Sequence, residues 1–166
     1  MNNTKYFLIY VILTFIFFSL ISCQKLIDGG HCKNMPQQID GGTGEIINNV
    51  LFKPTLSYSK EEQIITSDSL NIFGFVVSFD NGETYNPVDF SQYSILGKYA
   101  AWDGCMAFFD RNVTKDAKKK KYIYTIRTIS CGNCMLGGGS SNWVLIPKIE
   151  DGFAVEFVVE HTWWKR

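Results

Sequence analysis

The sequence has no excess of charge of either sign. Its 166 residues contain sixteen lysines and arginines and sixteen aspartates and glutamates, so the formal net charge is zero. Domains that bind nucleic acid usually carry a strong basic excess, which this chain lacks. The charge balance therefore predicts that nucleic acid is not a partner of this protein.

Common sequence motifs of catalysis and metal binding are absent as well. The chain has no G-x-S-x-G or H-E-x-x-H motif, and no pair of carboxylates stands at an informative spacing. A structural zinc site commonly uses two C-x-x-C pairs, but this chain has one such pair, and His31 and His161 are far apart in the sequence. These features predict a protein that is not an enzyme and that binds no metal ion or cofactor.

A short apolar segment stands near the N-terminus. Residues 6–21 are almost purely apolar and follow a short polar stretch with one positive charge. A membrane-spanning helix needs about 20 such residues, so this run has the length of a signal-peptide core instead. The run ends in Leu20-Ile21-Ser22-Cys23, which resembles the bacterial lipobox.

The lipobox resemblance implies cleavage before Cys23 and attachment of a diacylglycerol to its thiol. Further acyl chains such as palmitate would complete the anchor, since two or more chains hold a protein stably on a membrane. The alternative is an uncleaved single-span anchor with an incidental cysteine. Cys23 is followed by Gln24 rather than aspartate, which favours the outer membrane and leaves the periplasmic or surface face open.

The chain is predicted to have three parts. Residues 1–22 are the signal peptide. Residues 23–45 are rich in glycine and have little apolar periodicity, so they are predicted to be the lipidated N-terminus and a flexible tether. Residues 46–166 are predicted to form a single β-rich domain, because 46% hydrophobic and 15% aromatic residues are enough for a core.

The predicted fold is mainly β, either a small antiparallel sandwich or a partly open barrel. Turn residues separate short apolar or alternating segments. These segments predict strands near residues 46–58, 93–101, 105–110, 121–130, 143–149 and 153–161. Residues 67–79 combine helical and strand spacing, so the choice between one short helix and a strand stays open there.

Three local features extend this prediction. Residues 153–161 alternate as in a half-buried antiparallel strand, which would direct His161 into the core. The glycines at 137–139 have no G-K-[ST] ending, so they predict a flexible loop rather than a phosphate site. The lysines at 118–121 predict a solvated hairpin tip, with a basic patch for an acidic partner as the alternative.

Four cysteines remain after Cys23, namely Cys32, Cys105, Cys131 and Cys134. Export to an oxidising compartment favours structural disulfides, and four cysteines allow three pairings. A bond from Cys105 to either Cys131 or Cys134 would tie two strands together. The alternative is a thiol-redox protein that uses the C-x-x-C pair of Cys131 and Cys134, although glycines follow where such a motif needs a helix.

Four tryptophans are candidate binding residues: Trp102, Trp143, Trp163 and Trp164. Exposed tryptophans could stack on sugar rings, whereas the alternative is packing in the core with one residue at an edge. Adjacent residues of a strand point to opposite faces, so at most one of Trp163 and Trp164 is expected to be buried.

The export segment resembles that of small lipoproteins of Bacteroidota-type bacteria. Residues 88–99, with residues 144–148, resemble a small β domain of protease-complex accessory lipoproteins over about half of the mature chain. The resemblance implies a β fold and an accessory role. We therefore expect a lipid-anchored cell-envelope protein with a non-enzymatic β domain and an envelope protein as partner. The alternative is a lipoprotein that binds a glycan or another small molecule.

Overall fold

The structure is a computed structural model that describes residue 32 and residues 42–53, 61–132, 134 and 137–164. The predicted signal peptide, Cys23 and most of the predicted tether lie outside these residues. The described part is mainly β, as predicted. Its strands and short 3₁₀ helix are β1 Thr43–Gly44, β2 Leu51–Lys53, β3 Gln63–Ile65, η1 Asp68–Leu70, β4 Val76–Ser78, β5 Asn86–Pro87, β6 Tyr93–Asp103, β7 Met106–Asp116, β8 Lys121–Cys131, β9 Gly137–Pro147 and β10 Ala154–Trp163.

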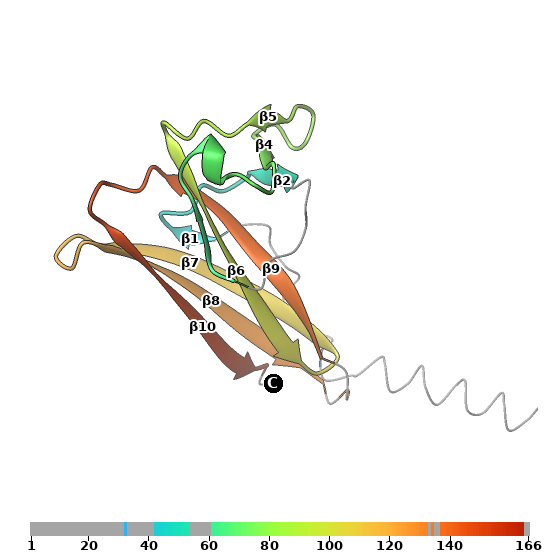
Figure 1. Ribbon diagram of the computed structural model, residues 1–166. Helices are drawn as coiled ribbons and strands as arrows, with labels where there is room; N and C mark the ends of the chain where they lie inside the picture. Colours follow the sequence, from blue (N-terminus) through green and yellow to red (C-terminus); the bar gives the residue numbers. More distant parts are fainter. Residues whose placement is uncertain (1–31, 33–41, 54–60, 133, 135–136, 165–166) are drawn as a thin grey trace, which may run out of the picture.

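The strands form three sheets (Figure 1). The largest has the order β1-β7-β8-β10, the second has the order β3-β6-β9, and a small third sheet has the order β2-β4-β5. The two larger sheets share a core cluster and pack face to face. The described strands do not close into a barrel, and the face-to-face packing of the two larger sheets is that of a sandwich.

The β3-β6-β9 sheet is covered on both faces. On β9, Val144 and Ile146 pack in a core cluster with the four-stranded sheet, whereas Leu145 packs in a second cluster under the small sheet. On β6, Leu96 and Ile95 divide between the same two clusters. A strand that is buried on both faces needs no alternation of polar and apolar residues. This explains the unbroken apolar run at the end of β9.

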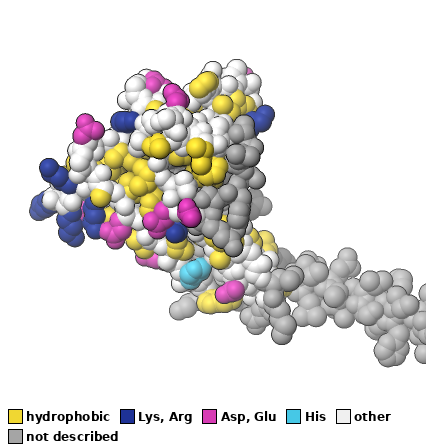
Figure 2. Space-filling model, in the orientation of Figure 1, with side chains coloured by type: hydrophobic (Ala, Val, Ile, Leu, Met, Phe, Trp, Pro, Cys, Tyr) yellow, Lys and Arg dark blue, Asp and Glu magenta, His cyan; other side chains and the backbone are white. Residues whose placement is uncertain are grey.

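β7 and β8 form a long antiparallel hairpin in which Asp116 pairs with Lys121. The turn between them carries the lysine run, where the backbone amide of Lys119 donates to Asp116 Oδ1 at 3.0 Å. Lys118, Lys119 and Lys120 are exposed, and Figure 2 shows lysines and arginines gathered at this corner of the molecule. The prediction of a solvated hairpin tip is confirmed for residues 118–120, whereas Lys121 begins β8 and its ammonium group pairs with the carboxylate of Glu156.

β10 is half-buried as predicted, but the predicted antiparallel pairing is wrong. It runs parallel to β8, beginning with Ala154 beside Lys121 and ending with Trp163 beside Ser130. β9 ends at Pro147, and the connection that follows crosses from one large sheet to the other before β10 begins. Alternation along one strand reports which face is buried and carries no information about direction, so the sequence pattern could not reveal the parallel pairing.

The prediction that His161 is a core residue is also wrong, although its parity is correct. Val155, Phe157 and Val159 pack against the core between the large sheets, whereas His161 and Trp163 on the same face are exposed. β10 is the edge strand of its sheet. Burial at inward positions therefore fades toward the end of β10, because the core cluster does not reach that far.

The three glycines at 137–139 were expected in a flexible loop, but they form the first residues of β9. Gly138 pairs with Trp102 of β6, and a Cβ on Gly138 would lie only 2.4 Å from the Trp102 ring. A Cβ on Gly139 would lie 1.7 Å from the hydroxyl oxygen of Tyr99. Aromatic rings of β6 lie flat over these glycines, so the missing side chains make room for the rings rather than for motion.

Residues 67–79 contain both of the alternatives that the sequence left open. η1 provides one short 3₁₀ turn, and β4 provides a strand. Between them, the side chain of Asn71 accepts a hydrogen bond from the backbone amide of Phe75 at 2.9 Å, which closes the turn. The folded part also begins earlier than residue 46, because β1 pairs with β7 within the stretch predicted as tether.

Candidate functional site

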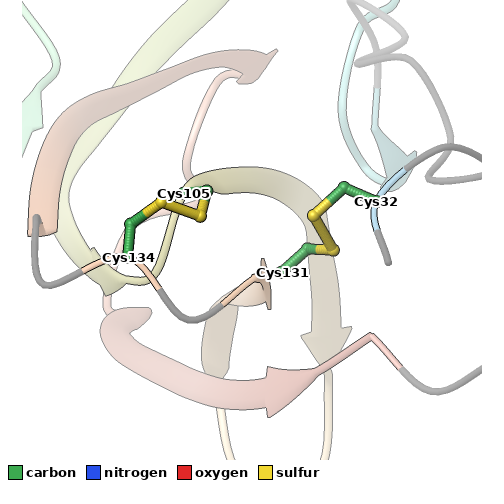
Figure 3. The surroundings of a disulfide bond; sticks show 4 residues. All are labelled: Cys32, Cys105, Cys131 and Cys134. Atoms are coloured by element: carbon green, nitrogen blue, oxygen red, sulfur yellow. A yellow bond between two sulfur atoms is a disulfide. The ribbon is translucent and has the colours of Figure 1, made fainter. Parts of the chain in front are cut away.

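Two disulfides lie close together where β6, β8 and β10 end (Figure 3). Cys32 is bonded to Cys131 with a Cα–Cα distance of 5.7 Å, and Cys105 is bonded to Cys134 with a Cα–Cα distance of 4.8 Å. The prediction of structural disulfides is confirmed. Of the two partners considered for Cys105, the structure selects Cys134.

The cysteines of the C-x-x-C motif are not bonded to each other. Cys131 and Cys134 take part in separate bonds with partners 99 and 29 residues away in the sequence. A dithiol redox site needs the two sulfurs of the motif to exchange with one another. The arrangement is therefore that of a structural clamp on three separate segments of the chain.

Two glycines allow the disulfides to pack so closely. Gly132 has a φ of +81°, and a Cβ there would lie 2.6 Å from the sulfur of Cys105. Gly104 has a φ of +100°, and a Cβ there would lie 2.7 Å from the carbonyl oxygen of Gly132. The backbone amide of Cys105 also donates to the carbonyl of Cys131 at 2.8 Å. We call this end of the molecule, with its two bonds and two glycines, the disulfide end.

The disulfide end gathers segments that are far apart in the sequence. The bond to Cys131 holds Cys32 there, although Cys32 precedes Cys131 by 99 residues in the sequence. The C-terminal part arrives through β10, and the backbone amide of Trp164 donates to the carbonyl of Ser130 at 2.8 Å. In Figure 1 this end lies opposite the lobe made by β2, β4 and β5.

The four candidate tryptophans are not brought together as one platform. Trp143 is buried among the rings of Phe73 and Phe75, so it belongs to the core. Trp102 is half-buried and meets Phe109 edge-on at 5.7 Å. At the disulfide end, Trp163 is 53% exposed and Trp164 is half-buried. Of the four, only Trp163 presents a largely free ring.

The opposite end carries an apolar surface that the sequence analysis did not find. Ile72, Phe79 and Leu70 have exposed fractions of 69%, 53% and 50%. We call these three residues, with the small sheet behind them, the distal lobe. Figure 2 shows hydrophobic side chains at the surface of this part of the molecule. The sequence feature that could have indicated this surface is the mixed spacing in residues 67–79. This segment has more apolar residues than a single buried face can hold, so some of them must be exposed.

A small pocket lies beside the distal lobe. It has a volume of about 220 Å³ and is lined by residues 46–52, Arg111 and residues 143–145. Nη1 of Arg111 donates to the carbonyl of Trp143 at 3.2 Å, which holds the guanidinium against β9. Ligand pockets usually have volumes of roughly 300–1,000 Å³, so this pocket would admit only a small group.

Perturbed pKa values in the described residues have structural causes. Hydrogen bonds from the Ser78 and Thr84 hydroxyls and from the Thr84 amide hold the pKa of Asp80 well below its usual range. Burial raises the pKa of Tyr124, whose hydroxyl donates to the carbonyl of Asn142 at 3.2 Å. The first arrangement closes a turn, and the second sits inside the core.

In the ranges that the structure describes, no group of three or more His, Cys, Asp or Glu side chains is placed to hold a metal ion. The helical part of these ranges is too short to cross a membrane. No known protein family, curated protein or solved structure matches the chain.

Proposed function

We propose that this chain is a lipid-anchored protein of the cell envelope whose β domain is a non-enzymatic interaction module. The lipobox at Cys23 supports the anchor. Disulfides persist outside the reducing cytosol, so two of them in one small domain support export. The accessory role is our interpretation of the distal lobe.

The observation that carries the proposal is the position of the exposed apolar side chains relative to Cys32. β6 starts beside the distal lobe, where Tyr93 contacts Phe79 with ring centroids 6.0 Å apart, and it ends beside the disulfide end. Its eleven residues span about 33 Å at roughly 3.3 Å per residue. A chain anchored through Cys23 and clamped at Cys32 would present the distal lobe away from the membrane.

Exposed apolar side chains that lie together mark surfaces for other proteins more often than isolated ones do. Leu70 ends η1, Ile72 follows it by two residues, and Phe79 comes directly after β4; all three side chains are at least half exposed. We therefore assign the distal lobe as the docking surface for an envelope protein.

The anchor is tested by intact mass and acyl labelling of the protein taken from its native membrane. We expect an N-terminal Cys23 with the mass of its acyl chains, and we expect the Cys23→Ala variant to lose both the label and the membrane association. An unprocessed and unlabelled wild-type chain would refute the anchor, and residues 6–21 would then act as a membrane span.

The docking surface is tested by site-specific photocrosslinking in intact cells. A photoreactive residue replaces Ile72 in one strain and Lys119, at the exposed hairpin tip, in a matched control strain. We expect one discrete protein adduct from position 72 that disappears when Leu70→Asp is added. Equal adducts from both positions, or an adduct that survives Leu70→Asp, would count against the distal lobe as the docking surface.

The pocket beside Arg111 supports a second candidate function, the binding of a small ligand. Trp143 lines this pocket, so a bound ligand would change its fluorescence. A titration with cell-wall sugars that shifts this emission in wild type and in Trp163→Phe alike would favour ligand binding. An unchanged emission would leave the interaction module as the better proposal.

A further inference from the structure

We propose that the disulfide end rests directly on the surface of the lipid bilayer that holds the acyl chains of Cys23. The contact surface consists of Trp163 on one face of the four-stranded sheet and Met106, Phe108 and Ile129 on the other. This inference rests on the proposed lipid anchor and adds an orientation and a lipid contact to it.

The first step is the length of chain between the lipid and the clamp. Cys32 follows Cys23 by nine residues, and an extended chain spans at most about 3.5 Å per residue, or roughly 30 Å. Cys32 is covalently bonded to Cys131 at the end of β8. The disulfide end therefore cannot move farther than about 30 Å from the bilayer, whereas the distal lobe is free to point away.

The second step is the chemistry of the surface within that reach. Trp163 is 53% exposed and Met106 is 54% exposed. Phe108 pairs with Ile129 across β7 and β8, on the same face as Met106, and both are half-buried. Tryptophan is favoured where a bilayer meets water, because its ring is apolar and its N–H group can still reach a polar partner.

The third step is the position of the charges, which limits how deeply the end can enter. Asp103, the last residue of β6, is exposed at the disulfide end itself, so its carboxylate must stay among the headgroups. On the outer face of the four-stranded sheet, Asp110 and Arg127 form the next row, with an ion-pair distance of 3.6 Å between them, and Glu160 joins Arg127 from β10. This row lies two residues beyond Phe108, or about 7 Å along the strands. The apolar row can enter the headgroup region while the charged row stays in water, so the contact is shallow.

A protein partner or a second copy of the chain could also cover these residues. The bilayer is the occupant that the covalent geometry supplies, because the bond at Cys32 and the lipid at Cys23 place this end beside it. The other occupants give different results in the experiment below.

The test uses lipidated protein purified from membranes and reconstituted into phosphatidylethanolamine–phosphatidylglycerol vesicles with or without bromine on the acyl chains. Bromine quenches tryptophan only at short range, so the difference between wild type and Trp163→Phe reports Trp163 alone. We expect brominated vesicles to quench wild type more strongly than Trp163→Phe. As a matched control, Ile72→Trp in the Trp163→Phe background places the reporter on the distal lobe, where we expect no added quenching.

A second variant tests the clamp. Cys32→Ser with Cys131→Ser removes the bond, so that twenty residues instead of nine separate Cys23 from Thr43, the first strand residue of the described part of the chain. We expect the quenching of Trp163 to fall while the acyl mass is unchanged. The emission of buried Trp143 checks that the domain remains folded.

The outcomes separate the two proposals. Acylated protein whose quenching is the same in wild type and Trp163→Phe overturns the bilayer contact and leaves the lipid anchor standing. Equal added quenching of the reporter at position 72 overturns the orientation in the same way. A purified chain without acyl mass refutes the lipid anchor and, with it, this inference.

Discussion

Gly97 is a position where adding one methyl group should destabilise the core. It pairs with Trp143 across β6 and β9, and a Cβ on Gly97 would lie 2.0 Å from Cζ3 and 2.2 Å from Cε3 of that ring. Phe75 and Phe73 restrict the ring on one side, with centroids 4.5 Å and 5.3 Å from its own, so the ring can give way only toward the pocket that it lines. Gly97→Ala must therefore shift the core or the backbone.

The expected loss can be estimated from these contacts. Overpacking a closed core costs about 1–3 kcal/mol, and more where nothing can give way. Replacing glycine by alanine within a strand returns roughly 0.5–1 kcal/mol through the unfolded chain. We expect Gly97→Ala to lower the free energy of unfolding by about 2 kcal/mol, measured as a lower urea midpoint at an unchanged m-value.

Gly139→Ala is the matched control. A Cβ there would lie 1.7 Å from the Tyr99 hydroxyl oxygen and 2.0 Å from its Cζ, so this ring must shift as well, but the Tyr99 side chain is half-buried rather than enclosed in the core. We expect a smaller loss than for Gly97→Ala, of about 1 kcal/mol or less. The reasoning is refuted if Gly97→Ala is neutral, or if Gly139→Ala is equally destabilising. A double-mutant cycle of Gly97→Ala with Trp143→Leu should show a coupling of roughly 0.5–3 kcal/mol, because the smaller side chain accepts the methyl group.

Two further predictions concern the disulfides and the buried tyrosine. Loop-closure entropy predicts that the bond between Cys32 and Cys131 stabilises the fold by about 4.7 kcal/mol and the bond between Cys105 and Cys134 by about 3.6 kcal/mol. Urea unfolding should therefore show a larger loss of unfolding free energy when Cys32 and Cys131 are replaced by serines than when the other pair is. Burial raises the pKa of Tyr124, so above about pH 10 the unfolded chain releases a proton that the folded chain keeps. The free energy of unfolding should fall as the pH rises through that range. Tyr124→Phe should lower it by about 1 kcal/mol at pH 7, through the lost hydrogen bond, and should make the fall at high pH shallower. An equally steep fall in the variant would contradict this reasoning.

Strands with one buried face could be predicted from the sequence, because the alternation of apolar and polar residues is visible within each strand. Residues 121–130 and 153–161 were predicted as strands; the first range lies within β8, and all of the second but residue 153 lies within β10. Their direction relative to one another depends on a crossover between sheets, which no local pattern records. The same limit explains His161, whose face was predicted correctly but whose exposure depends on where the core ends.

The small sheet and the distal lobe were beyond local prediction for a different reason. β2, β4 and β5 have only two or three residues each, too few for a period to be counted. They are held by packing on one face of the β3-β6-β9 sheet rather than by the intrinsic strand propensity of their own residues. The residues that carry our proposed docking surface therefore lie in the part of the chain where sequence patterns are weakest.

The disulfide end shows how two sequence features, the specific lipobox and the ambiguous set of four cysteines, together indicate an orientation. The lipobox predicts where the chain meets the membrane but is silent about the domain, and four cysteines alone leave three pairings open. The bond between Cys32 and Cys131 joins the two. It shortens the predicted tether of 23 residues to the nine residues that lead from Cys23 to Cys32, and it fixes the end of this segment at the disulfide end. Under the proposed lipid anchor, this bond would decide which end of the sandwich faces the bilayer. The exposed Trp163 and Ile72, at opposite ends of the domain, are then candidates for different partners.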